Sequence, residues 1–532
     1  MLTLKHNQQQ NSLLQGFNRK QKSAILILSI FLLNFAIYGV NCFQFSLCGD
    51  EIRELMEGIP DIYIAQNRWG TVLWKELFGY GYMPFLSFLI FAVTSSLIAY
   101  LHTELFNIQN FSNKLIYAVA FTLCPLWLSI NRFSELIDIF SISMLLATMA
   151  VSNITSAKSP SQYIIAIILA TLSLAVYQVN LFYMATLWLA WYTSSLFHCQ
   201  HRNFLREAIR AFVIILISII IYVTIAIILR NSGLASPKII AEAASYQGNF
   251  ATTWKTVLQS KSIIYILRVF GHYTIETVLC HSGIKSLIGA SSTYTHIYLW
   301  AGNLCCVWLM IQTWRKYTAK NSAILNILTY SVLFISFSAY LFSAGKMNEF
   351  RMHIPCSISI AFMFTMLAEI NKNKPSVIRL IHIILLLTMI KGAYSHTETL
   401  RNNAWNFERT KLQFIEIKHH CKDIAKQNGL KEYKVYLAGD WWPIKSISLY
   451  NALEVAEAPF LTGIVQPFAV KNYAAYFGCG NIERMENIDT PEEIKHILQT
   501  KPVWPDPDSV FIYNGDIIIK VYENPPPRNQ KV

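Results

Sequence analysis

Charged side chains are scarce in this sequence. Asp, Glu, Lys and Arg make up 14% of the 532 residues, whereas 54% are hydrophobic and the mean hydropathy is +0.36. Soluble globular chains carry about 25% charged residues. The composition therefore favours a protein whose main solvent is lipid, and the length of the uncharged runs decides between a membrane protein and one very large soluble core.

The motifs of several common catalytic classes are also absent. The sequence contains no Walker loop, no GxGxxG after a predicted strand and no HExxH, so nucleotide hydrolysis and the usual zinc chemistry lack support. The ten cysteines show no metal-ligand spacing. Cys421 and Cys479 share the C-terminal segment, where a disulfide is expected only if that segment lies outside the cell membrane. No internal repeat is visible.

Long uncharged runs are the dominant feature that is present. Residues 23–40, 212–229 and 324–342 contain almost no charge. Each approaches the roughly 20 apolar residues that cross a hydrocarbon core of about 30 Å, where only a helix satisfies every backbone polar group internally. The first run is longer than the apolar part of a signal peptide and lacks a cleavage site. We expect eleven spans, near 23–46, 83–104, 114–131, 134–152, 162–179, 181–198, 211–230, 297–314, 323–343, 354–370 and 377–394.

The net charge of +13 lies mainly in short loops between these spans. With the N-terminal tail in the cytoplasm, six basic segments fall on the cytoplasmic side, as the positive-inside tendency requires. This pattern favours a topology signal over nucleic-acid binding. It also requires 254–296 to stay outside, with 263–280 as an interfacial or re-entrant helix. A true span at 263–280 would reverse everything that follows.

The spans divide the chain into four parts. A cytoplasmic tail, 1–22, precedes a transmembrane domain, 23–395. Outer loops of that domain are expected at 47–82, 231–296 and 344–353. The remaining parts are an outer α/β domain at 396–524 and a disordered tail at 525–532. In the α/β domain, 434–439 is typical of a strand, and Asn514-Gly515 between two β-rich runs predicts a hairpin.

The most informative outer loop follows the first span. It carries a carboxylate pair, Asp50 and Glu51, and later Arg68 and Trp69. A carboxylate at the membrane edge suits a general base that acts on a polar acceptor, and an Arg on the same loop can bind a phosphate in bidentate fashion. The alternative is a solvated loop whose charges pair with one another.

Two inter-span turns supply further polar groups on the same side. Arg132, Glu135 and Asp138 lie where the third span passes into the fourth, and both carboxylates share a helix face. Ionisable groups at membrane depth often mark function, although an Arg–Glu pair that closes the hairpin is the alternative. Gln178 lies at the turn after the fifth span, where it can bond sugar hydroxyls or the backbone of the turn.

A cationic patch precedes the tenth span. Lys346, Arg351 and His353 stand on the outer side, against the positive-inside tendency. This favours an anion-binding role, such as holding a lipid phosphate. In the α/β domain, Asp440-Trp441-Trp442 can stack on a sugar or pack in an interface.

Taken in order, these motifs resemble the bacterial serotype-converting O-antigen glucosyltransferases, multi-span enzymes of the GT-C type. The resemblance covers about 45–400 and rests on Asp50-Glu51, Arg68-Trp69-Gly70, Arg132 to Asp138, Tyr177-Gln178 and Arg351 to Pro355. The family often has two aspartates where this chain has Asp50-Glu51, and Gly where this chain has Asn67. The C-terminal domain has no motif in common with it.

The resemblance implies an enzyme of the bacterial inner membrane that acts at its periplasmic face. The donor would be undecaprenyl-phosphate-glucose and the acceptor a lipid-linked O-antigen, with a flippase and a donor synthase as candidate partners. Asp50, with Glu51 as its rival, would be the base. Arg68, Lys346 and Arg351 would face the donor phosphate, while Trp69, Arg132, Asp138 and Gln178 would contact substrate. No cofactor is expected in this scheme, and a phosphate leaving group beside fixed cations has no obvious need for a metal, although the carboxylate clusters could hold a divalent ion.

Two other classes of protein remain to be considered. A transporter or flippase of lipid-linked sugars would favour charges midway through the spans and a two-fold repeat. A membrane-embedded acyl- or phospho-group transferase would call for a His-centred or metal-centred site. The ionisable residues gather instead at the outer ends of the spans, which favours the glycosyltransferase.

Overall fold

The computed structural model describes twelve stretches of the chain. These are 17–42, 54–55, 60–79, 84–131, 136–200, 203–246, 293–336, 338, 353–438, 467–480, 482–485 and 491–521. The predicted re-entrant segment 263–280 and the tail 525–532 lie outside the described residues.

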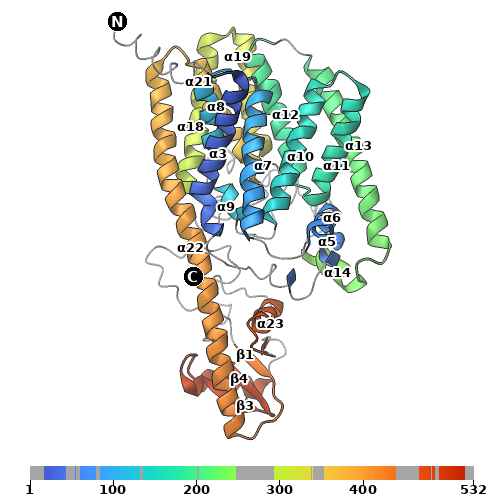
Figure 1. Ribbon diagram of the computed structural model, residues 1–532, viewed down its shortest axis with the longest axis vertical. Helices are drawn as coiled ribbons and strands as arrows, with labels where there is room; N and C mark the ends of the chain where they lie inside the picture. The colour runs from blue at the N-terminus through green and yellow to red at the C-terminus, as the bar shows by residue number, and fades with distance from the viewer. Residues whose placement is uncertain are drawn as a thin grey trace, which may run out of the picture.

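Helices dominate these stretches and form one bundle (Figure 1). Its helices, with the short ones that flank it, are α3 (Arg19–Tyr38), α5 (Pro60–Ala65), α6 (Trp69–Phe78), α7 (Pro84–Leu105), α8 (Phe111–Thr122), α9 (Leu126–Asn131), α10 (Ile137–Ser156), α11 (Pro160–Val176), α12 (Asn180–Phe197), α13 (Phe204–Asn231), α14 (Pro237–Tyr246), α18 (Thr293–Lys316), α19 (Ala319–Ser336), α21 (Cys356–Ile370) and α22 (Pro375–Gln427).

Within the described residues, five helices are long and apolar enough to cross a membrane. They cover Lys20–Tyr38, Phe85–Leu105, Ile137–Ser156, Phe204–Asn231 and Pro375–Glu398. This confirms the expected class, a helical membrane protein. Of the five, α13 is the most apolar, and only 22% of its apolar segment is buried inside the protein. Its Ile-rich surface is therefore left available to lipid.

Local sequence signals explain where several helices begin and end. Asn18 caps α3 in a capping box with Gln21, and Pro160 occupies the first turn of α11, where its missing N–H costs nothing. The single span expected at 114–131 is in fact two helices, α8 and α9. The chain breaks at Cys124-Pro125, because a proline ring cannot continue the preceding helix.

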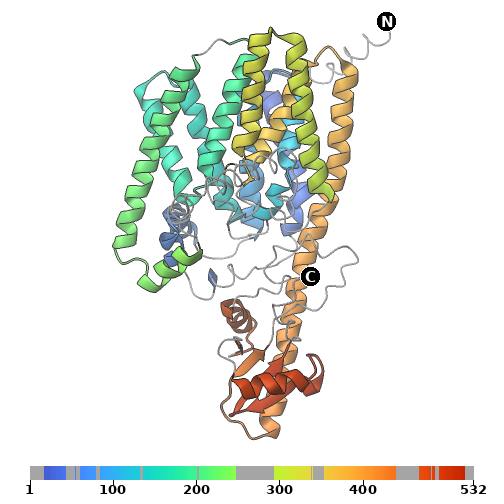
Figure 2. The same ribbon diagram turned by 180° about the vertical axis from the view of Figure 1, so that it is seen from behind.

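The last helix of the bundle continues into the C-terminal domain. At about 1.5 Å per residue, the 53 residues of α22 reach about 80 Å, far more than a membrane requires. The helix therefore runs unbroken through residue 396, where the sequence suggested that the outer domain begins. Figure 2 shows its lower half standing outside the bundle and holding the small domain.

A four-stranded sheet packs against this lower half of α22. The strands are β1 (Val435–Ala438), β2 (Ile482–Arg484), β3 (Val510–Tyr513) and β4 (Asp516–Lys520), accompanied by α23 (Pro467–Tyr476) and α24 (Glu492–Thr500). Their order is β2-β1-β4-β3, with β1 parallel to both neighbours.

The structure of this domain bears on two predictions, the hairpin and the disulfide. The hairpin is confirmed: β3 and β4 are antiparallel, and both Asn514 and Gly515 have positive φ angles, as a tight hairpin turn requires. Cys421 and Cys479 lie together in the apolar core beneath the sheet, but both are free thiols.

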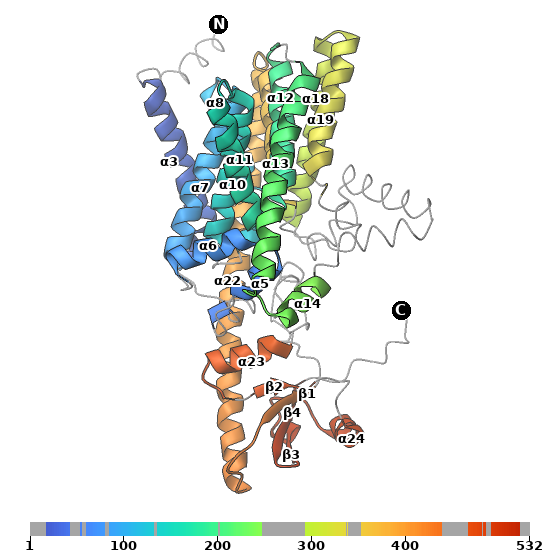
Figure 3. The same cartoon turned by 90° about the vertical axis from the view of Figure 1, so that its right-hand side faces the viewer.

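The bundle has two chemically different ends. The basic residues Lys22, Lys114, Lys158, Lys320 and Lys372 belong to helix ends and turns at one end (Figure 1). At the other end, α5, α6 and α14 lie across the helix ends and face the C-terminal domain, as Figure 3 shows from the side. This second end contains the described residues of the predicted site.

Candidate functional site

A tight turn between α5 and α6 presents the Arg-Trp motif. Asn67 adopts a left-handed conformation, with φ of 60°, which Asn tolerates better than most residues. The backbone N–H of Arg68 donates to the carbonyl of Tyr63 over 2.6 Å. The turn thus reverses the chain, and Trp69 begins α6.

Gln178 and Tyr222 hold this turn in place. The side-chain amide of Gln178, in the turn between α11 and α12, donates to the carbonyl of Gln66 and to the Tyr222 hydroxyl, each over 2.9 Å. The Tyr222 hydroxyl, from α13, in turn donates to the carbonyl of Asn67 over 3.0 Å. Three elements distant in sequence are therefore joined at the backbone of the Arg68 turn.

Tyr177 provides an aromatic face for Arg68. The guanidinium carbon of Arg68 lies 5.4 Å from the centroid of the Tyr177 ring, within the range of a cation–π interaction worth about 0.5–2 kcal/mol. Stacking on the ring keeps the guanidinium at the junction of α6 and the α11–α12 turn. A planar cation held in this way is suited to bind a phosphate.

Close packing of α6 on α11 fixes the same junction. A Cβ atom added to Gly70 would come within 3.0 Å of the backbone carbon and the Cβ of Ala175 and of a methyl group of Val176. The absence of a side chain at Gly70 therefore sets how close Trp69 and Arg68 lie to Tyr177.

Gly70→Ala is expected to push α6 away from α11. Because the crowded atoms include backbone, strain of about 1–3 kcal/mol is expected, together with a lower Tm. The Tm of the protein purified in detergent measures the effect. The control is Leu77→Ala, because Leu77 is exposed on the same helix. Equal Tm values for Gly70→Ala and Leu77→Ala would contradict this reading of the packing.

A buried ion pair lies farther along α6, beyond the Arg68-Trp69 motif. The Lys75 ammonium, on α6, pairs with the carboxylate of Glu54, and each side chain is only 5% exposed. The Tyr63 hydroxyl donates to the other carboxylate oxygen over 2.6 Å, and the ammonium lies 5.6 Å from the centroid of the Tyr63 ring. Glu54 is thereby tied to both α5 and α6.

Asp138 connects α6 to the start of α10. Its Oδ2 accepts a hydrogen bond from the indole N–H of Trp74 over 3.2 Å, and its Oδ1 accepts one from the backbone N–H of Ile139 over 2.7 Å. The carboxylate thus satisfies a donor in the first turn of its own helix, where negative charge is favourable. The ammonium of Lys75 also acts on it electrostatically.

Trp69 contributes a buried donor to this region. Its indole N–H has no hydrogen-bond partner among the described residues. A buried donor left unsatisfied costs about 1–3 kcal/mol, so a ligand that accepts a hydrogen bond from this N–H would gain affinity. Trp69 is half-buried at the start of α6 and packs against the core of the bundle.

The structure brings together four of the residues that the sequence singled out. Arg68, Trp69, Asp138 and Gln178 all lie around α6 at one end of the bundle. His353, named with the cationic patch, is buried in the turn just before α21. The other predicted site residues, Asp50, Glu51, Arg132, Lys346 and Arg351, lie outside the described residues.

Sequence reasoning missed the partners that position these side chains. Lys75, Tyr63, Trp74 and Tyr222 were not singled out, although each contacts the site directly. A signal existed for two of them. Lys75 and its neighbour Glu76 are the only charged residues in the sequence of α6, and Tyr222 is the one tyrosine in the Ile-rich run of α13.

A short segment links the site to the C-terminal domain. Residues 54–55 are helical; Glu54 bonds to α5 and α6, while Leu55 packs against the apolar core of the C-terminal domain, beside residues such as Phe407 and Tyr473. The small domain therefore contacts the segment between α3 and α5, which also carries Asp50 and Glu51 in sequence. Within the described residues, no group of three or more His, Cys, Asp or Glu side chains is placed to hold a metal ion.

Comparison with known proteins identifies the family. No curated protein matches the chain. A family model described as glucosyl transferase GtrII matches residues 39–366, which include α6, the Asp138 region and the Gln178 turn. The matched stretch is more than half of the chain and confirms the resemblance read from the motifs. This membrane protein therefore belongs to the GtrII glucosyl transferase family, the serotype-converting O-antigen glucosyltransferases.

Proposed function

We propose that this enzyme transfers glucose from undecaprenyl-phosphate-glucose to a lipid-linked O-antigen at the periplasmic face of the bacterial inner membrane. Family membership supports a glucosyltransferase of O-antigen modification. The donor, the acceptor and the face of the membrane are our proposal. A flippase and a donor synthase would supply the donor on that face.

The convergence on α6 is the observation that carries this proposal. A guanidinium from Arg68, an unpartnered buried indole N–H from Trp69, and the carboxylate of Asp138 come from separate segments and meet at one end of the bundle. Cationic and neutral donors next to apolar helices suit a ligand with a phosphate, a sugar and a lipid tail. Preorganised donors of this kind stabilise charge that develops on a leaving phosphate.

The reaction would be a single in-line displacement. The acceptor hydroxyl oxygen attacks the anomeric carbon of glucose, and its proton passes to the carboxylate of Asp50, or of its rival Glu51. The bond between the anomeric carbon and the phosphate oxygen breaks, and the phosphate leaves with the bonding electrons. Arg68, with Lys346 and Arg351 from the loop before α21, would stabilise that charge, so no metal is required.

Asp138 and Gln178 fit positioning roles in this scheme. The two side chains form hydrogen bonds with Trp74, Ile139, Gln66 and Tyr222, and so fix the orientation of α6 and its leading turn. Misplacing a substrate-binding group by about 1 Å can cost about 10²-fold in rate. Arg132 is proposed to complete the pocket from the adjoining turn.

The membrane arrangement proposed here has eleven crossings. Each predicted span overlaps a helix of the bundle, and the basic turns lie together at the end opposite to α6. We place that end, with the N-terminus, in the cytoplasm by the positive-inside tendency. The α6 end and the C-terminal domain are then periplasmic.

The proposal predicts a change in surface polysaccharide that depends on this protein. Cells that produce it should carry glucose branches on the O-antigen, and cells that lack it should not. Sugar composition and linkage analysis of purified polysaccharide measures this, with cells that lack the donor synthase as a control. Identical polysaccharide with and without the protein, when the protein is present in the membrane, would rule out the proposed reaction in that host.

A further inference from the structure

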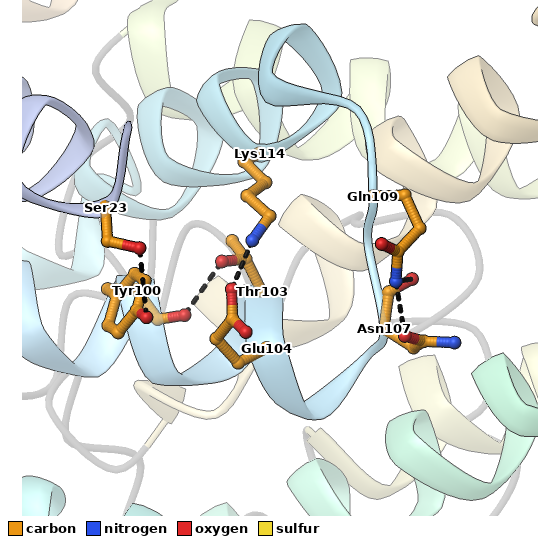
Figure 4. A network of polar contacts seen from close by, with 7 residues as sticks. All are labelled: Ser23, Tyr100, Thr103, Glu104, Asn107, Gln109 and Lys114. Atoms are coloured by element: carbon orange, nitrogen blue, oxygen red, sulfur yellow. Dashed lines mark hydrogen bonds and ion pairs between the residues drawn. The ribbon is translucent and has the colours of Figure 1, made fainter. Parts of the chain in front are cut away.

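A polar pocket lies at the end of the bundle opposite to the candidate site. It has a volume of about 380 Å³ and is lined by residues of α3, α7 and α8 and of the turn between α7 and α8. Figure 4 shows three polar contacts from these segments: Ser23 with Tyr100, Lys114 with Glu104, and Gln109 with Asn107. Neither the transfer reaction nor the family match assigns a role to this region.

The charged groups of the pocket leave one positive charge in excess. The Lys114 ammonium pairs with the carboxylate of Glu104 and lies 6.0 Å from the centroid of the Tyr100 ring. Lys22 also lines the pocket, and among the ion pairs of the described residues none involves its ammonium. Two ammonium groups and one carboxylate give a formal charge of +1, which matches a single phosphodiester.

Neutral hydrogen-bonding groups surround these charges. The Ser23 hydroxyl donates to the Tyr100 hydroxyl over 3.2 Å, so the proton of Tyr100 is available to a ligand. The side-chain nitrogen of Gln109 donates to the side-chain oxygen of Asn107 over 2.5 Å and to its backbone carbonyl over 3.4 Å, and the side-chain oxygen of Gln109 can accept from a ligand hydroxyl. These groups suit the hydroxyls and the phosphate oxygens of a polar headgroup.

The pocket lies at the depth of lipid headgroups. Lys22 is in the first turn of the candidate span Lys20–Tyr38, and Glu104 is in the last turn of the candidate span Phe85–Leu105. Further along α3, Leu28 and Leu32 are each 57% exposed and offer an apolar surface for acyl chains. Basic pockets between membrane helices are known to bind lipid headgroups.

We propose that this pocket binds the headgroup of a monoanionic glycerophospholipid, of the phosphatidylglycerol class. The phosphate is held by Lys22, next to the Lys114–Glu104 pair, and the headgroup hydroxyls bond to Gln109 and Tyr100. A second negative charge is disfavoured by Glu104. The bound lipid would fix the depth of α3, α7 and α8 at this membrane boundary.

The test compares lipid retention by the full-length protein and three variants. Each is purified in a mild detergent and mixed with phosphatidylglycerol, phosphatidylethanolamine or phosphatidylcholine, and bound lipid is counted by native mass spectrometry. Lys22→Gln removes the excess charge and should weaken phosphatidylglycerol retention about fivefold, the typical effect of one basic residue near the membrane surface. Glu104→Gln raises the pocket charge to +2 and should strengthen retention, which a folding defect would not do.

Lys158→Gln is the matched control. Lys158 is exposed at the same end of the bundle, in the turn between α10 and α11, and its loss should leave retention unchanged. Equal retention by wild type and Lys22→Gln would overturn the proposal, as would weaker retention by Glu104→Gln. The proposal would also be overturned if phosphatidylethanolamine and phosphatidylcholine were retained as strongly as phosphatidylglycerol. Binding of soluble glycerophosphoglycerol as tight as that of phosphatidylglycerol would overturn it too and would point to a free phosphodiester instead.

Discussion

Replacing Glu54 by Ala is expected to be among the most damaging single changes in this enzyme. Glu54 is the counter-ion of Lys75, and both side chains are 5% exposed. Removing one partner of a buried pair leaves an uncompensated charge and costs about 3–5 kcal/mol. The Tyr63 hydroxyl loses its acceptor as well. We expect a large drop in folded protein recovered from membranes and in its Tm.

A double variant separates the structural role of this pair from a chemical one. In Glu54→Leu with Lys75→Met, both charges are replaced by apolar groups of similar size, so stability should recover toward that of the wild type. Size-exclusion recovery and Tm in detergent measure folding, and polysaccharide analysis measures transfer. Wild-type stability of the single variant Glu54→Ala would show that the pair does not hold α5 and α6 together.

The segment 54–55 also bears on what the C-terminal domain does. Leu55 packs into the core of that domain, while Glu54 holds α5 and α6. The domain packs against the end of α22, whose 53 residues form one continuous helix. The distance between the domain and the bundle is therefore fixed by helix geometry rather than by a loop. We infer that the domain braces segment 54–55 and, through Glu54, the helices α5 and α6 of the candidate site.

Local chemistry made much of the fold predictable. Apolar runs located α3, α13 and the first half of α22, because a membrane imposes a minimum helix length. Asn514-Gly515 identified the hairpin, because few residue pairs accept two positive φ angles. The break at Pro125 and the continuity of α22 past residue 396 were missed. In the second case, the polar residues that suggested a domain boundary are compatible with a helix that leaves the lipid.

The site was predictable in its residue types but not in its contacts. Arg68, Trp69, Asp138 and Gln178 stood out because polar groups are rare in this chain. Nothing in the sequence indicates that Gln178 bonds to Gln66, 112 positions away, or that Trp74 bonds to Asp138, 64 positions away. Such pairs depend on the packing of α6 against α10 and α11, which only the folded bundle determines.

Asp50→Asn is expected to remove most of the catalytic activity while leaving the protein in the membrane. The substitution keeps the shape of the side chain but removes the carboxylate that we propose as the base for the acceptor hydroxyl. General-base catalysis contributes about 10²–10⁴-fold in rate, so glucosylation of the polysaccharide should fall to background. Linkage analysis of the polysaccharide, with immunoblotting of membranes, gives the two readouts.

Asp61→Asn provides the matched control, because it makes the same chemical change in the same outer loop. Asp61 lies in the first turn of α5 and is half-buried, and no catalytic role is proposed for it. Its variant should keep most of the transfer activity. Glu51→Gln decides between the two neighbouring acids: if it abolishes transfer while Asp50→Asn does not, the base is Glu51. Full activity in both variants, at normal protein level, would exclude this acidic pair from catalysis and move the search for the base to another carboxylate near α6.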